Sequence, residues 1–161
     1  MDLTKKINNV LVDLELLVEQ KKAHINVEAM PKVKGYSRQL QQLFQNLIGN
    51  ALKYSKANVV PEITITAHKV QGHEIVTRIL MEQRDQFFYL IKVSDNGIGF
   101  EQAYAERIFS MFQRLHGKSE YEGTGVGLSI ARKVVENHHG YIWADSEPGV
   151  GSTFSILLPI I

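Results

Sequence analysis

Two carboxamide side chains and a lysine share one stripe of a predicted helix in the first third of the chain. Apolar residues recur at helical spacing from residue 37 to about residue 54. Asn46, Asn50 and Lys53 fall away from that apolar side. Amide oxygens are hard ligands suited to Mg²⁺ when phosphates complete its coordination shell, and a lysine ammonium can meet a phosphate. Taken alone, the stripe fits helix caps or polar surface residues at least as well.

The sequence DNGIGF, residues 95–100, follows directly on a predicted strand. The carboxylate of Asp95 can accept a hydrogen bond from an exocyclic amine such as that of adenine. Gly97 and Gly99 would let a flat base lie close to the backbone. An Asx turn is the alternative, with the Asn96-Gly97 pair supplying positive dihedral angles. That alternative does not explain the second glycine.

A second glycine-rich stretch, EGTGVGLSIA, occupies residues 122–131. Gly123, Gly125 and Gly127 lead directly into a predicted apolar helix. Glycines before a helix permit close backbone approach and present free N–H groups to an anion. The stretch lacks the Gly-Lys-Ser/Thr of a P-loop, and glycines also serve ordinary tight turns, so alone it is weak support for a phosphate site.

Between these two stretches lies RIFSMFQRLHGKSEY, residues 107–121, a segment with several basic side chains. Its aromatic residues Phe109 and Phe112 have a spacing more typical of a core than of ligand contacts. A polar loop between glycine clusters is also typical of a lid, and Arg114 is the candidate to stabilise charge on a transferred phosphate. A further glycine turn, GVGST at residues 149–153, predicts only a hairpin by itself.

The elements that must position these residues follow from hydrophobic periodicity. Apolar spacing predicts helices over about residues 1–20, 37–54 and 128–137, with a short helix at 103–109. Alternating β-branched and aromatic residues predict strands at 25–30, 62–67, 74–82, 87–95, 141–145 and 152–158. Helices segregated from a mostly antiparallel sheet predict an α/β fold, a two-layer sandwich.

Composition narrows the classes of function. The 161 residues suit one domain, and the net charge of +1 provides no global field that would favour nucleic acid or an anionic membrane. The absence of cysteine excludes disulfides and thiolate metal sites, and no apolar run reaches membrane-spanning length. We therefore expect a cytoplasmic domain. The six histidines lack the pairing of a metal cluster, and His138 and His139 are expected to interact with a helix C-terminus.

In this order the motifs resemble the N box, the F box and the three glycine boxes of the GHKL ATP-binding superfamily. Within it, the chain looks most like the catalytic ATP-binding (HATPase) domain of bacterial sensor histidine kinases, and residues 104–154 look closest to phytochrome-type and PAS-containing kinases. The resemblance spans nearly the whole chain, so it implies a single domain, residues 1–161, with the Bergerat ATP-binding fold.

The resemblance implies ATP and Mg²⁺ as ligands. It implies that Asn50 chelates Mg²⁺, that Asp95 binds the adenine amino group, and that Asn46 and Arg114 act on the reaction itself. Thr153 would support the base through its hydroxyl. The implied nucleotide-binding residues are Asn46, Asn50, Lys53, Tyr54, Asp95, Gly97, Gly99, Phe112, Gly123, Thr124, Gly125, Val126, Gly127, Leu128 and Thr153.

The reaction follows from what stands four residues before Asn50. ATP-hydrolysing members of the superfamily place a glutamate there as general base for water, whereas this chain has Asn46, which cannot take a proton. We therefore expect transfer of the γ-phosphoryl group to a nucleophile other than water. The resemblance implies that this nucleophile is a histidine on a separate dimerisation domain, whose phosphoacceptor motif is absent from this chain, and that a response regulator receives the group indirectly. An anti-sigma-type serine kinase and a non-enzymatic nucleotide-binding module of the same fold are the alternatives.

Overall fold

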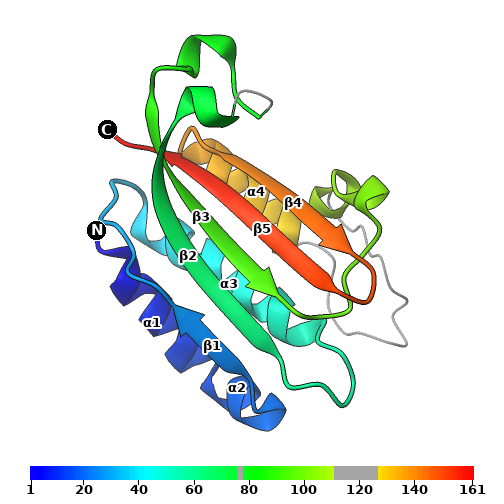
Figure 1. Ribbon diagram of the computed structural model, residues 1–161. Helices are drawn as coiled ribbons and strands as arrows, with labels where there is room; N and C mark the ends of the chain where they lie inside the picture. Colours follow the sequence, from blue (N-terminus) through cyan, green and yellow to red (C-terminus); the bar gives the residue numbers. More distant parts are fainter. Residues whose placement is uncertain (76–77, 111–126) are drawn as a thin grey trace.

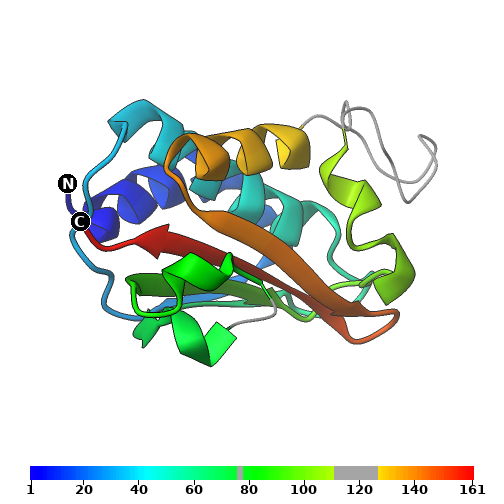
Figure 2. The ribbon, with the colours of Figure 1, turned by 90° about the horizontal axis from the view of Figure 1, so that it is seen from above.

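The computed structural model describes residues 1–75, 78–110 and 127–161, and these form two layers (Figures 1 and 2). One layer is a five-stranded sheet, and the helices lie against one of its faces. This arrangement confirms the predicted α/β sandwich. No helix within the described ranges combines the length and the apolar character needed to cross a membrane.

The sheet has the strand order β1-β2-β3-β5-β4. Its strands are β1 (His24–Val27), β2 (Glu62–Gln71), β3 (Phe87–Asp95), β4 (Tyr141–Glu147) and β5 (Gly151–Pro159). β1 pairs with β2 in parallel, and the other three pairings are antiparallel. The sheet is therefore mixed and mostly antiparallel, as the pattern of the sequence predicts.

The helical layer contains α1 (Leu3–Asp13), α2 (Glu15–Lys21), α3 (Ser37–Lys53) and α4 (Gly127–Asn137). α3 contacts both α1 and α4, and the apolar side chains of all three meet the sheet in one core. The single helix predicted over residues 1–20 is divided at Leu14, whose dihedral angles leave the helical region.

The strand predicted over residues 74–82 is wrong. β2 and β3 pair directly from Gln71 and Phe87 onward, and the connection between them forms two 3₁₀ turns, η1 (Gly72–Ile75) and η2 (Met81–Gln83). This connection lies on the sheet face opposite the helices (Figure 2), where Ile75 and Ile79 pack against the cluster of Phe88, Trp143 and Leu157. The two isoleucines are therefore partly buried by packing on a sheet face and not within a ladder of hydrogen bonds.

The short helix predicted at residues 103–109 is also replaced by two 3₁₀ turns, η3 (Gln102–Tyr104) and η4 (Arg107–Phe109). Phe109 is buried, and its ring packs edge-on against Phe154, with the ring centroids 6.1 Å apart. This contact gives Phe109 the core role that its spacing favours.

His138 joins the end of α4 to the start of α3. The Tyr36 backbone N–H donates to His138 Nε2 at 2.9 Å, so Nδ1 carries the proton and donates to the Val134 carbonyl at 2.7 Å. The second bond confirms the predicted contact with a helix C-terminus. The first was not predicted, because Tyr36 lies 102 residues away in sequence.

Candidate functional site

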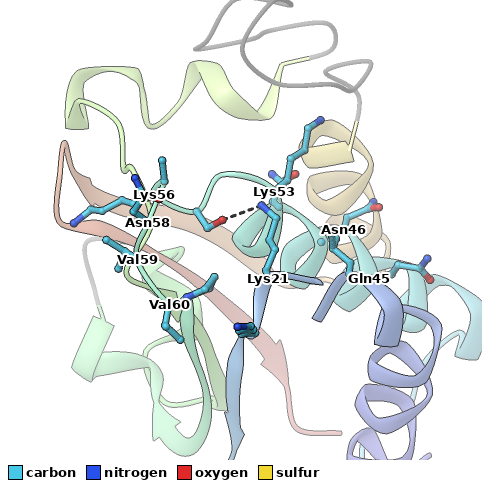
Figure 3. Close-up of a pocket in the computed structure, with 15 residues that line it drawn as sticks. Lys21, Gln45, Asn46, Lys53, Lys56, Asn58, Val59 and Val60 are labelled. Atoms are coloured by element: carbon cyan, nitrogen blue, oxygen red, sulfur yellow. Dashed lines mark hydrogen bonds between the residues drawn. The ribbon is translucent and has the colours of Figure 1, made fainter. Parts of the chain in front are cut away.

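The polar stripe of α3 exists because the opposite side of the helix is committed to the core. Leu43, Leu47 and Leu52 are fully buried, which leaves Asn46, Asn50 and Lys53 half-buried on the other side. Figure 3 shows Asn46 and Lys53 projecting from α3 beside an open groove. The stripe therefore presents two amides and one ammonium to a common space.

Asn46 is tied to the start of α4. Its Nδ2 atom donates to the Gly127 carbonyl at 3.1 Å. Because this bond commits the amide nitrogen, the Asn46 oxygen is the atom that can accept a further hydrogen bond or meet a cation. Gly127 is the first residue of α4, so the structure brings the N-box helix and the end of the glycine-rich stretch together.

Asp95 lies at the end of β3, where the strand meets the loop DNGIGF. Its Oδ1 atom accepts from the backbone N–H groups of Gly97, at 2.9 Å, and Ser152, at 3.3 Å. Burial raises the pKa of the Asp95 carboxyl, and the two backbone hydrogen bonds oppose that rise only in part. A desolvated carboxylate at a strand end is costly, which is typical of a group held for a ligand.

An Asx turn, the alternative to the ligand interpretation, is present in this loop. Asp95 forms it by accepting a hydrogen bond from the Gly97 N–H, and the Asn96 side chain does not take part. Asn96 instead bridges to the preceding loop, where it accepts from the Glu62 N–H and donates to the Val60 carbonyl. Among the residues of this loop only Gly99 has a positive φ, of 66°. The alternative in which the Asn-Gly pair supplies the positive dihedral angles is therefore wrong in that detail.

Both glycines of the loop pack against protein backbone. A Cβ on Gly97 would lie 2.5 Å from the Tyr54 carbonyl oxygen, and a Cβ on Gly99 would lie 2.1 Å from the Glu147 carbonyl oxygen. The Ile98 N–H donates to the same Tyr54 carbonyl at 2.9 Å. These contacts place the loop against the end of α3 and the end of β4, and they account for both glycines without a bound base.

Tyr54 and Thr153, two further residues of the predicted site, lie at the end of α3 and on β5. Tyr54 is the C-cap of α3, and the Lys53 ammonium lies 5.3 Å from the centre of its ring. Thr153 lies opposite Ser94 in the β3–β5 ladder, and their hydroxyl oxygens are 3.0 Å apart. Thr153 also follows Ser152, which donates to Asp95, so Thr153 and Asp95 lie at the same end of the sheet.

Part of the predicted site lies outside the described residues: Phe112, Arg114, Gly123, Thr124, Gly125 and Val126. Leu128 is described, and it packs against the hydrophobic core from the first turn of α4. The contact of any of these side chains with a nucleotide stays a prediction.

Three lysines of the groove were not predicted. Lys21 and Lys22 come from the end of α2 and Lys56 from the segment after α3, and all three line the same groove as Asn46, Asn50 and Lys53. Their positions in sequence carry no motif. Lys56 lies just after α3, whereas the packing of α2 against α3 brings Lys21 and Lys22 beside the polar stripe.

Solved structures share this fold. The catalytic domain of the histidine kinase ThkA superposes with a TM-score of 0.75 over 99% of this chain and 93% of that one, at 23% identity. Full-length ShkA, solved in complex with AMPPNP, superposes with a TM-score of 0.75 over 99% of this chain and 30% of its own, at 22% identity. The fold is therefore that of a histidine-kinase catalytic domain.

The sequence comparisons give the family. The chain belongs to the histidine kinase-, DNA gyrase B- and HSP90-like ATPase family, which matches residues 35–161. It is 40% identical over 99% of its length to the phytochrome-like protein Cph1 of Synechocystis, and 32% identical over 99% to the adaptive-response sensory kinase SasA of Thermosynechococcus vestitus. It spans 19% of the former and 39% of the latter.

Proposed function

We propose that this domain binds Mg-ATP between α3 and the start of α4 and donates the γ-phosphoryl group to a histidine on a separate domain of a sensor kinase. A response regulator would receive the phosphoryl group from that histidine. The observation that carries the proposal is the bond between the Asn46 amide and the Gly127 carbonyl. An amide, and not a carboxylate, occupies the position where hydrolases of the superfamily hold their general base, so activation of water is disfavoured.

The adenine end of the nucleotide is assigned to Asp95 and Thr153. Asp95 Oδ1 is occupied by two backbone N–H groups, which leaves Oδ2 to accept from an exocyclic amine. Such a bond is worth more in a desolvated site than in water. The neighbouring Thr153 hydroxyl is already paired with Ser94, so its orientation is set before a ligand arrives.

The phosphate end is assigned to the stripe of α3. Within the described residues no three His, Cys, Asp or Glu side chains converge on a possible metal position. A divalent cation would thus depend on the amide oxygens of Asn50 and Asn46 and on the phosphates of the nucleotide, a donor set that fits Mg²⁺. The bound ion would neutralise charge on the phosphates. Lys53 would add a point charge on the same side of the helix.

The proposed phosphoryl transfer does not require a strong general base on this chain. An imidazole acceptor can attack as the neutral base, so positioning and charge neutralisation carry the rate. Arg114, predicted to stabilise the developing charge, keeps that role as part of the proposal. A cytoplasmic location would supply the ATP.

Calorimetric titration with a non-hydrolysable ATP analogue, with and without Mg²⁺, tests the proposal. We expect binding that weakens at least tenfold on chelation of the metal or in Asn50→Ala, since even the loss of an outer-shell partner of a metal ligand typically costs about 10–100-fold in metal affinity. Asn137→Ala is the matched control, because Asn137 bonds to Gln39 on the exposed side of α4 and α3. Equal affinity with and without Mg²⁺ would contradict the metal assignment.

A second assay separates transfer from hydrolysis. Labelled ATP is incubated with this chain alone and with the acceptor domain of its parent kinase added in trans. We expect label on a histidine of the acceptor and slow release of phosphate by the chain alone. Rapid hydrolysis by the isolated chain would show that a group other than Asn46 activates water and would contradict the proposed reaction.

A further inference from the structure

An open groove of about 1540 Å³ runs from the polar stripe of α3 to the end of α2 (Figure 3). Its walls are the C-terminal end of α2, the exposed side of α3 and residues 55–61. Lys21, Lys22, Lys53 and Lys56 all line it, and none of its described lining residues is an aspartate or a glutamate. We call this feature the lysine groove.

One of the four lysines holds the groove in shape. The Lys21 ammonium donates to the Leu52 carbonyl at 2.5 Å and to the Ser55 hydroxyl at 2.9 Å. Leu52 lies in the last turn of α3, where carbonyls lack partners within the helix. Lys21 therefore fastens α2 to α3, and it remains beside the groove as a fixed positive charge.

Two of the other lysines, Lys22 and Lys56, make no such structural hydrogen bond within the described residues. Neither the Lys22 nor the Lys56 ammonium takes part in an ion pair or hydrogen bond within the described part of the chain. Lys22 also has a φ of 54°, in the left-handed region that glycine usually fills at a helix end. A lysine there costs backbone energy, which is consistent with a use for its side chain.

The groove also has an apolar wall. Val59 and Val60 are 44% and 47% exposed, and both line the groove with Pro61. A small anion would use the ammonium groups and leave this wall in water. A protein surface that carries both carboxylates and apolar side chains matches both features.

The groove adjoins the nucleotide site proposed above. Asn46, Asn50 and Lys53 line it and also form the stripe assigned to the phosphates. A protein segment seated between Lys22 and Lys56 would therefore lie next to the phosphoryl group that is to be transferred. The nucleotide itself would approach Asp95, which is not among the groove's lining residues.

We propose that the lysine groove receives an acidic, amphipathic surface of the domain that carries the acceptor histidine. This inference rests on the proposed function for the identity of the partner. The lysines attract the partner's carboxylates and set its register, and the valines are covered when it is seated.

The test uses charge reversal at the two lysines without structural bonds. Lys22→Glu/Lys56→Glu is compared with Lys32→Glu/Lys34→Glu, which makes the same change in net charge at two exposed lysines of the segment before α3. The probe is a fluorescein-labelled amphipathic helical peptide of Glu, Ala and Leu, read by anisotropy at low salt. A peptide with Lys in place of Glu is the specificity control.

We expect the acidic peptide to bind the wild-type chain and the Lys32/Lys34 variant alike, and to bind the Lys22/Lys56 variant about tenfold more weakly. Failure of the acidic peptide to bind, or equal losses in both variants, would overturn the proposal. Affinity for the Mg-ATP analogue is measured in parallel. A loss of nucleotide affinity in the Lys22/Lys56 variant would assign the two lysines to the nucleotide site and also overturn the proposal. Absence of nucleotide binding in the wild type would count against the proposed function alone.

Discussion

The substitution Gly99→Ala separates a packing role for this glycine from a role in ligand contact. Gly99 has a φ of 66°, and a Cβ added there would lie 2.1 Å from the Glu147 carbonyl oxygen. Gly149 offers a matched control, because its φ is 79° and a Cβ added there would meet no atom within 4 Å. Both substitutions place a Cβ on a left-handed backbone, which costs free energy, and only Gly99→Ala must also displace the Glu147 carbonyl.

The magnitudes follow from these contacts. The left-handed conformation costs about 1–2 kcal/mol for a residue with a Cβ, and overpacking a fixed neighbour adds about 1–3 kcal/mol. The Glu147 carbonyl has little room to move, since Glu147 pairs with Gly151 in the β4–β5 ladder. The loop is also held on both sides of Gly99, by Gly149 N–H to Ile98 O at 2.7 Å and by Phe100 N–H to Ser146 Oγ at 2.9 Å. We therefore expect Gly99→Ala to lower the free energy of unfolding by about 2–5 kcal/mol and Gly149→Ala by about 1–2 kcal/mol.

Urea unfolding followed by circular dichroism measures both variants, and titration with the ATP analogue at low temperature measures the folded fraction's affinity. Equal stability of the two variants would refute the packing argument. If Gly99→Ala were as stable as Gly149→Ala yet failed to bind the nucleotide, the glycine would serve the ligand and not the contact with Glu147.

Three further predictions follow from the same structure. Asp95→Asn should stabilise the ligand-free domain at neutral pH and weaken the preference for ATP over GTP, because it removes a desolvated charge and the acceptor for the adenine amine. Burial raises the pKa of Asp95 in the folded state, so the wild type should lose stability relative to Asp95→Asn as pH rises from the ordinary aspartate pKa through the raised one. Urea midpoints measured from pH 3.5 to 7 would show this loss. A stability difference that grows toward acid would contradict it. His138→Ala should cost about 2–4 kcal/mol by urea unfolding, because it strands the Tyr36 N–H and opens a cavity, and a loss below about 1 kcal/mol would count against the link between α4 and α3. Lys21→Met should lower the affinity for the Mg-ATP analogue severalfold and Lys21→Arg less so, because the last turn of α3 loses its tie to α2, and unchanged affinity in Lys21→Met would contradict this link.

The sequence by itself determined the elements whose pattern is long and periodic. The apolar spacing of α3 and α4 and the alternation in β2, β3 and β5 predict these elements, and with them the positions of the polar stripe on α3 and of Asp95 at the end of β3. These predictions succeed because one face of each element must be buried, and that requirement is written locally in the order of side chains. The order of the motifs was also enough to indicate the family.

Other features depend on contacts between segments far apart in the chain. Residues 74–82 alternate like a strand, but β2 pairs directly with β3, and Ile75 and Ile79 pack instead against the cluster that contains Trp143. The local pattern cannot show which neighbour satisfies an apolar side chain. The same limit hid the bond between Tyr36 and His138, and the backbone contacts that explain Gly97 and Gly99.

The lysine groove shows the division most clearly. Lys21 and Lys22 end one helix and Lys53 and Lys56 lie at the end of another, and no motif connects the two pairs. The packing of α2 against α3 brings the pairs together, and the hydrogen bonds from Lys21 to Leu52 and Ser55 are part of that contact. The sequence thus fixes which chemical groups α3 and β3 carry, because that depends on local periodicity. The tertiary structure decides which charges surround them, because electrostatic fields depend on distance in space and not on separation along the chain.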